Sequence, residues 1–145
     1  MNNKGIKKRI KYTKTQNRQE AKYMLKKYTI GTRGEKIAKK YLIKQGLRLI
    51  SSNERILGDE IDLVFMDDKR QKKEIVFVEV KTRTNNKFGG PLESIDKRKG
   101  NAIRRGIENY IKRANWKGFY RLDVLSVIIN DNETQIEHIK DVMLD

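Results

Sequence analysis

Two carboxylates, Asp62 and Glu79, are expected to face each other across a hairpin near the middle of the chain. They lie in segments 60–65 and 76–81, which are rich in β-branched and aromatic residues and therefore predict strands. The polar run at 67–73 predicts the turn between them. Pairing that is symmetric about this turn places the two carboxylates directly opposite each other.

The same register predicts further pairs across the hairpin, and these are Phe65–Val76, Leu63–Val78, Ile61–Val80 and Glu60–Lys81. One face is then wholly apolar, and a slip of one residue would mix the two faces, so the pattern favours this register. Opposed side chains have Cβ atoms roughly 5 Å apart, and like charges at that distance repel. The carboxylate pair therefore needs a cation or a proton between its members, and a divalent metal is the simplest choice.

Phosphodiester hydrolysis is the chemistry that this arrangement suits. Asp62, Glu79 and the backbone carbonyl of Val80 could hold Mg²⁺ or Mn²⁺, since hard cations prefer oxygen ligands. Lys81 lies two residues after Glu79, on the same face of the strand, where it could orient water or stabilise negative charge. The alternative is a set of cross-strand salt bridges, since Glu-x-Lys strings are common in a chain rich in both residues.

The charge of the chain points to a polyanionic partner, most often nucleic acid. The formal net charge is +15 over 145 residues. Residues 1–30 carry ten Lys and Arg against one acid, which gives +9, and residues 31–145 carry twenty-four against eighteen, which gives +6. The basic N-terminal extension at 1–30 could also be a solubility tail.

Several classes of function are excluded by composition. The chain has no cysteine, so disulfides, cysteine-ligated zinc and thiol catalysis are ruled out. No stretch approaches 18 apolar residues, and the N-terminus lacks the apolar core of a secretory signal. A cytoplasmic protein without a membrane span is expected.

A helix is predicted over 32–45 of the chain. Thr32 and Glu35 have the spacing of a capping box, and Gly46 is a typical stop residue. The preceding extension is expected to be disordered, or helical only over 18–28.

The remaining elements complete an α/β pattern. They are a strand at 47–51, the hairpin, a loop at 83–93, a helix at 94–114, and strands at 119–129 and 135–139. The order α-β-β-β-α-β-β predicts one mixed sheet flanked by helices, in a single domain at 31–145.

Four separated blocks of sequence resemble a known family. They are GTRGEKIA at 31–38, Gly46, GDEIDL at 58–63 and VFVEVKTR at 76–83, and the resemblance continues through Phe88-Gly89, Lys99 and RLDV at 121–124. The chain resembles the YraN-like family, small bacterial proteins of unassigned function with a restriction-endonuclease-like fold. That family is similar to Holliday-junction resolvases and other nucleases of the PD-(D/E)xK type.

The resemblance implies a metal site at Asp62 and Glu79, with Lys81 as the catalytic lysine. It also implies an additional acidic residue, Glu35, from the first helix, although Glu35 could instead serve only as part of the helix cap. The implied activity is a metal-dependent nuclease that acts on DNA and has some structural preference. By analogy with junction resolvases, a homodimer is plausible. The alternative is a nucleic-acid-binding module that keeps the nuclease scaffold without turnover.

Further basic residues are candidates for contacts with nucleic acid. These candidates are Lys99, Arg83, Lys87, Arg104 and Arg105. Lys99 could instead be an ordinary surface lysine. Arg121 and Asp123 share a face of a strand and are expected to form a structural ion pair, and His138, the only histidine, is expected to be structural or exposed.

Overall fold

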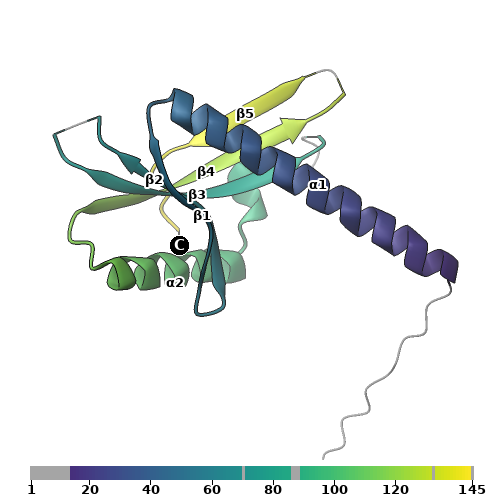
Figure 1. Cartoon of the computed structure of the whole chain (residues 1–145), viewed down its shortest axis with the longest axis horizontal. Helices are drawn as coiled ribbons and strands as arrows, with labels where there is room; N and C mark the ends of the chain where they lie inside the picture. The colour runs from purple at the N-terminus through teal and green to yellow at the C-terminus, as the bar shows by residue number, and fades with distance from the viewer. Residues whose placement is uncertain (1–13, 70, 86–88, 132, 145) are drawn as a thin grey trace, which may run out of the picture.

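Within the described residues, five strands form one mixed sheet, and a helix packs on each of its faces (Figure 1). The computed structural model describes residues 14–69, 71–85, 89–131 and 133–144. The elements follow the predicted order α-β-β-β-α-β-β, with a short 3-10 helix before the second α-helix. The predicted α/β class is therefore confirmed.

The strands lie side by side in sequence order. They are β1 (Arg48–Ile56), β2 (Asp59–Asp67), β3 (Glu74–Arg83), β4 (Phe119–Ile129) and β5 (Thr134–Ile139). Neighbours are antiparallel except β3 and β4, which are parallel. A parallel pair needs a long crossover, and α2 (Lys97–Ala114) supplies it.

The hairpin of β2 and β3 has the predicted register in its inner part. Leu63 pairs with Val78 and Phe65 with Val76, as the alternation predicted. The ladder stops at Leu63, so the pairs predicted beyond it do not form as backbone pairs. There the Asp62 carboxylate accepts a hydrogen bond from the Val80 N–H at 2.8 Å, in the place of a backbone acceptor.

Ile61 does not lie on the face predicted for it. It packs with Phe77 under α2, whereas Leu63 packs on the α1 side. The alternation of β2 is thus interrupted between them, at the residue where its ladder with β3 has ended. On the neighbouring strand, Asn53 has a left-handed φ of 51°. A pattern of period two cannot show such an interruption.

The first helix is much longer than predicted. Helix α1 (Lys14–Lys44) runs without a break through Thr32, so the predicted start at residue 32 and its capping box are wrong. Residues 18–30 contain no proline and many good helix formers, so nothing in them stops the helix. The predicted end is confirmed, because Gly46 has a φ of +88° and the Leu47 N–H bonds back to Leu42. The division of the chain at residue 30 stays a prediction, and residues 1–13 lie outside the described part.

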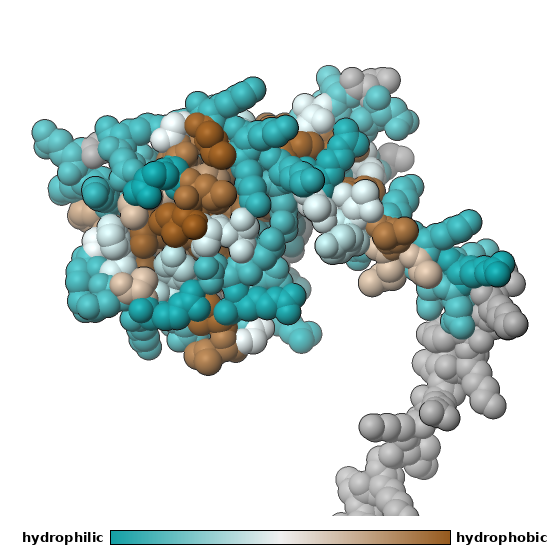
Figure 2. Space-filling model, viewed as in Figure 1, coloured by the Kyte–Doolittle hydropathy of each residue, from teal (hydrophilic) through white to brown (hydrophobic). Residues whose placement is uncertain are grey.

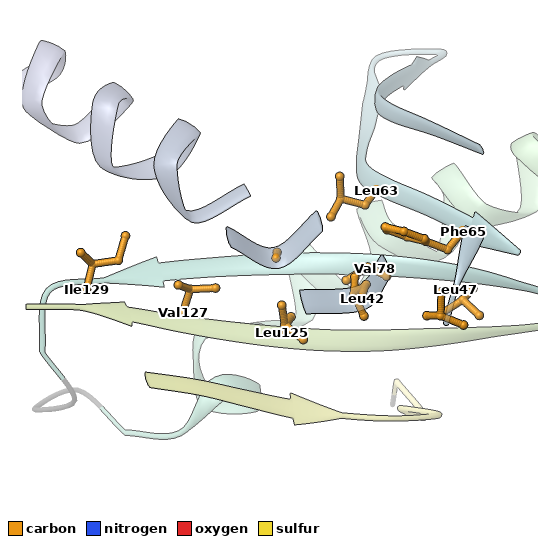
Figure 3. Close-up of a cluster of buried hydrophobic side chains, with 10 residues drawn as sticks. Leu42, Leu47, Leu63, Phe65, Val78, Leu125, Val127 and Ile129 are labelled. Atoms are coloured by element: carbon orange, nitrogen blue, oxygen red, sulfur yellow. The ribbon is translucent and has the colours of Figure 1, made fainter. Parts of the chain in front are cut away.

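Helix α1 packs closely on the sheet through small residues. Ala38 and Leu42 are fully buried in the cluster that also contains Leu63 and Leu125, and Figure 3 shows this cluster. Gly34 faces Thr82 of β3 so closely that a Cβ there would collide with the threonine side chain. This contact fixes the height of α1 over the end of β3.

Helix α2 packs on the opposite face of the sheet, through Ile103, Ile107 and Tyr110. It begins three residues later than predicted, because Pro91–Ser94 forms a 3-10 turn first. Asp96 caps the helix by accepting a hydrogen bond from the Lys99 N–H at 2.7 Å. No helix in the described part of the chain combines the length and apolar character that crossing a membrane requires.

Candidate metal and nucleic-acid site

A cavity of about 590 Å³ lies at the open end of the β2–β3 hairpin, beside α1. Both predicted carboxylates and the predicted lysine line it. Its charged lining comprises Lys27, Glu35, Asp62, Glu79, Lys81 and Arg83. Residues from α1, β2 and β3 therefore meet in one hollow, as the sequence predicted for Glu35, Asp62 and Glu79.

Asp62 is held at the point where the hairpin ladder ends. Burial raises the pKa of its carboxyl to about 7, and the negative charge of Glu79 adds to the increase. The hydrogen bond from Val80 and the charge of Lys99 act in the opposite direction. This carboxyl therefore holds its proton more tightly than an ordinary aspartate does, because the site disfavours a second negative charge beside Glu79.

Glu79 is the more buried of the two carboxylates, with 4% of its surface exposed. Two lysines neutralise it: the Lys99 Nζ lies 3.2 Å and the Lys81 Nζ 3.6 Å from its Oε1. Burial lowers the pKa of Lys99, but the charge and hydrogen bond of Glu79 outweigh this and hold it above the usual value. A carboxylate this deep requires such partners, because an unpaired buried charge is costly.

The predicted pair of Glu60 with Lys81 is not formed. Lys81 contacts Glu79 on its own strand, two residues away, as expected for side chains on one face. Glu60 lies instead opposite Arg55 in the β1–β2 ladder. The lysine is therefore directed at the Glu79 carboxylate.

Glu35 reaches the cavity from the middle of α1. Its side chain accepts a hydrogen bond from the Asn53 Nδ2 at 3.4 Å, and its negative charge contributes to the raised pKa of Asp62. Since α1 continues through Thr32, the capping interpretation of Glu35 is wrong. The neighbouring contact of Gly34 with Thr82 places Glu35 beside β3.

The predicted nucleic-acid contacts divide into two groups. Lys99 contacts Glu79, and Arg83 lines the cavity while donating a hydrogen bond to the Gly89 carbonyl at 2.7 Å. Arg104 and Arg105 point elsewhere, and their roles stay predictions. Arg104 donates to the Leu144 carbonyl at 2.8 Å, and Arg105 pairs with Asp59 at 3.1 Å. Lys87 lies outside the described residues.

The sequence interpretation missed the contribution of α1 before residue 32. Lys27, Ile30 and Gly31 line the cavity, and Lys27 also lies over the Tyr23 ring at 6.0 Å. The signal was available in the helical period, because residues 27 and 31 are eight and four positions before Glu35 and share its side of a helix. Only the premature helix start concealed it.

The structural ion pair predicted for β4 is confirmed. The Arg121 Nε lies 3.0 Å from Asp123, whose other oxygen is 2.8 Å from the Nε2 of buried His138. Burial raises the pKa of Asp123, yet its hydrogen bonds from His138, Arg121 and the Asp141 N–H hold that pKa below the usual value. None of these residues lines the cavity, and His138, which was predicted to be structural or exposed, has a buried side chain beside Asp123.

The donor set of the cavity fits a hard divalent cation. In the described part of the chain, no three Asp, Glu, His or Cys side chains converge as a ready ligand cluster. Mg²⁺ does not need one, because it commonly takes one or two carboxylates and keeps several waters. Asp62 and Glu79 provide two carboxylates whose mutual repulsion a cation would relieve.

The fold and the position of the acidic pair define a class of protein. A mixed sheet built in the order α-β-β-β-α-β-β, with Asp62 on β2 and Glu79-Val80-Lys81 on β3, is restriction-endonuclease-like. Residues 34–127 match the model of the uncharacterised protein family UPF0102. The chain belongs to this family, as the resemblance to YraN-like proteins predicted.

Bacterial relatives are similar over most of their length. A UPF0102 protein of Caldanaerobacter subterraneus is 37% identical over 118 residues, which cover 81% of this chain and 93% of the relative. A UPF0102 protein of Caldicellulosiruptor bescii is 40% identical over 116 residues, which cover 77% and 94%. One of Mycolicibacterium gilvum is 39% identical over 116 residues, which cover 78% and 92%.

Proposed function

We propose that this protein is a metal-dependent nuclease that hydrolyses phosphodiester bonds in DNA and prefers certain substrate shapes. The observation that carries the proposal is the pair of carboxylates, buried Glu79 and half-buried Asp62, in a cavity that also presents Lys81. A raised pKa in a cleft, caused by burial and a specific charged neighbour, is typical of functional sites.

Asp62, Glu79 and the Val80 carbonyl are the groups that would hold Mg²⁺ or Mn²⁺. When bound, such a cation supplies positive charge to a phosphate oxygen and lowers the pKa of a bound water. Lys81, whose side chain is 26% exposed, can reach both the carboxylates and a phosphate in the cavity. Its charge would stabilise the negative charge that develops on the phosphate. Glu35 would accept a hydrogen bond from the attacking water and so orient it.

Basic residues around the cavity favour a polyanionic substrate. Lys27 and Arg83 line the cavity from α1 and β3, and they would contact the phosphates on either side of the bond that is cut. Arg104 and Arg105 are proposed as contacts outside the cavity, and Lys87 as a further contact with nucleic acid. By analogy with junction resolvases, we also propose a two-fold dimer, which sedimentation analysis would test, and a cytoplasmic location.

A screen of substrate shapes tests the proposal. The purified protein is incubated with and without Mn²⁺ on single-stranded DNA, linear duplex and a four-way junction. We expect Mn²⁺-dependent cleavage of at least one of them, and we expect Asp62→Ala and Lys81→Ala variants to bind the same substrate without cutting it. Failure of the wild-type protein to cut any substrate would remove the enzymatic proposal.

One observation favours a binding module without turnover. Lys99 and Lys81 both lie against Glu79, so the protein itself already neutralises this carboxylate. In that case the cavity would bind a phosphate but no divalent cation. Calorimetry separates the two functions, because a binding module should show no heat of binding for Mg²⁺ or Mn²⁺.

A further inference from the structure

A continuous row of positive charge follows the outward side of α1. Successive positions on one side of a helix are three or four residues apart, and from residue 18 to residue 44 eight such positions occur. Seven of them are basic, and we call these seven the α1 stripe: Arg18, Lys22, Lys26, Arg33, Lys36, Lys40 and Lys44. The eighth is Thr29, and no acidic residue falls in the row.

The α1 stripe lies on the side of the helix away from the sheet. At about 100° per residue its members span an arc of about 80°, whereas Gly34, Ala38 and Leu42, the buried residues of α1, lie on the far side of the helix. All seven side chains are exposed. Among the described residues, none of the seven forms an ion pair with an acidic side chain. A row of exposed cations without protein partners repels itself and is available to an anion.

We propose that the α1 stripe is a second nucleic-acid-binding surface, which holds the phosphate backbone of a duplex. The stripe is about 40 Å long, at 1.5 Å of rise per residue. Duplex DNA offers one negative charge per roughly 1.7 Å of its axis, so a straight row of cations of this length meets phosphates along most of it. The contacts would be with the backbone and would carry no sequence preference.

The part of the nucleic acid that the α1 stripe binds differs from the part that enters the cavity. Glu35, Gly31 and Lys27 line the cavity from the opposite side of α1, so the helix separates the two surfaces. The N-terminal half of α1 also extends beyond the sheet (Figure 1), and hydrophilic side chains cover much of it in Figure 2. A bent or branched nucleic acid could contact both surfaces at once. The proposed second surface deepens the proposed nuclease function. It rests on that function only for the cleavage in the cavity, and not for the binding of DNA by the α1 stripe.

An anionic membrane is the less suitable occupant. A helix that binds at a membrane surface needs an apolar face to insert beside its cations. The apolar residues Ala38 and Leu42 of the second half of α1 are fully buried against the sheet. In the first half, Met24, Leu25 and Tyr28 are exposed within an arc of about 100°, and Tyr23 lies on another side of the helix. This apolar patch covers little more than one helical turn, whereas the α1 stripe runs from residue 18 to residue 44, so charge complementarity favours a phosphate polymer as the occupant.

The test compares two variants of the full chain that lose the same charge. The stripe variant carries Arg33→Gln, Lys36→Gln and Lys40→Gln, and the matched control carries Lys73→Gln, Lys117→Gln and Lys140→Gln, three exposed lysines off the stripe and outside the cavity. Binding to a 20-bp DNA duplex is measured by fluorescence anisotropy over a range of KCl concentrations, in EDTA. Circular dichroism confirms folding, and Lys22→Gln with Lys26→Gln serves as a second stripe variant.

We expect the slope of log K against log salt to become shallower by about 2 to 3 in the stripe variant, since each lost phosphate contact removes roughly 0.9. The control should change it by less than about 1. Equal changes in the two variants would overturn the proposal, because net charge alone would then explain binding. If the stripe variant lost binding to phosphatidylserine vesicles while its slope on DNA stayed unchanged, the proposal would be overturned in favour of a membrane as the occupant.

The same variants separate this proposal from the nuclease proposal. Mn²⁺-dependent cleavage of a single-stranded oligonucleotide too short to span both surfaces should be the same in the stripe variant as in the wild-type protein. Loss of that cleavage would contradict an independent second surface. If the wild-type protein cuts nothing, the nuclease proposal fails, while the anisotropy result in EDTA still decides the role of the α1 stripe.

Discussion

Asp62 is the residue whose protonation reports on the whole site. Its pKa of about 7 results first from burial and then from the charge of Glu79, and the hydrogen bond from Val80 only partly offsets them. A carboxyl whose pKa is raised in the folded state binds its proton more tightly there than in the unfolded chain. Its ionisation therefore destabilises the fold increasingly as the pH rises from about 4 through 7.

Replacing Asp62 with Asn should stabilise the metal-free protein at alkaline pH. A shift of the pKa from 3.8 to about 7 corresponds to roughly 4 kcal/mol at 1.36 kcal/mol per unit, and solvent exposure would reduce this figure. We expect Asp62→Asn to raise the free energy of unfolding by roughly 2 to 4 kcal/mol at pH 8, and by much less at pH 4. Urea unfolding in EDTA at the two pH values measures it.

Asp67 provides a control with the opposite sign. Burial raises its pKa, but hydrogen bonds from the Lys69 N–H and from Arg121 outweigh this, so the pKa is lowered overall. Its contribution to stability is present above its unfolded pKa and is lost in acid. Asp67→Asn should therefore destabilise the protein at pH 8, and this effect should shrink as the pH falls below the ordinary aspartate value of 3.8. If both variants shifted stability in the same direction at pH 8, the electrostatic account of Asp62 would be wrong.

Lys99 competes with a cation for Glu79, to which its Nζ lies at 3.2 Å. Removing this positive charge should strengthen metal binding, because a nearby like charge repels the incoming cation. We expect Lys99→Met to tighten Mn²⁺ binding roughly tenfold, or about 1.4 kcal/mol, in calorimetry. Lys97→Met, an exposed change in the same helical turn, should leave it unchanged. Weaker Mn²⁺ binding in Lys99→Met would contradict this account.

The strands and helix α1 show why local sequence patterns predict some secondary-structure elements correctly and others wrongly. The strands and the inner register of the hairpin could be predicted, because alternation is local and a slipped register would expose the core. The start of α1 could not be predicted, since the spacing of a capping box also occurs by chance inside helices. Here no helix breaker precedes Thr32, so the helix continues through it. The interruption at Ile61 also escaped prediction, because it depends on a side chain, Asp62, taking the place of a backbone acceptor.

Two glycines of α1 make a matched pair for testing how the helix is seated. A Cβ at Gly31 meets nothing within 4 Å, whereas one at Gly34 collides with Thr82. We expect Gly31→Ala to stabilise the protein by about 0.5 to 1 kcal/mol through helix propensity, and Gly34→Ala to destabilise it by about 1 to 3 kcal/mol. Chemical denaturation measures both. Stabilisation by Gly34→Ala would show that α1 does not approach β3 as described.

The candidate site as a whole combines parts that the chain alone could suggest with parts that only packing reveals. Asp62, Glu79 and Lys81 follow from strand pairing, and Glu35 followed from the family resemblance. Lys99 reaches Glu79 because α2 crosses beneath the hairpin, and Lys27 joins the cavity because α1 is longer than predicted. Contacts between distant elements depend on how helices are seated on the sheet, which no local pattern specifies.

Metal binding should be visible in the stability of the whole molecule. A ligand that binds only the folded state stabilises it by roughly 2.7 kcal/mol at one hundred times its Kd. We expect Mn²⁺ to raise the melting temperature of the wild-type protein at pH 7.5 and to have little effect on Glu79→Gln. Equal increases in both proteins would place the bound cation outside the cavity.

The rate of DNA cleavage by matched proteins tests the central proposal most directly. Wild-type protein, Asp62→Asn and the matched control Asp131→Asn, an exposed change outside the cavity, are compared under single-turnover conditions with Mn²⁺, on the substrate shape that the screen selects. The account predicts cleavage by the wild-type protein and by Asp131→Asn, and a loss of at least about a hundredfold in Asp62→Asn, since one electrostatic contribution to a transition state is commonly worth that much. Cleavage by Asp62→Asn at the wild-type rate would contradict it, and so would the absence of cleavage by all three proteins.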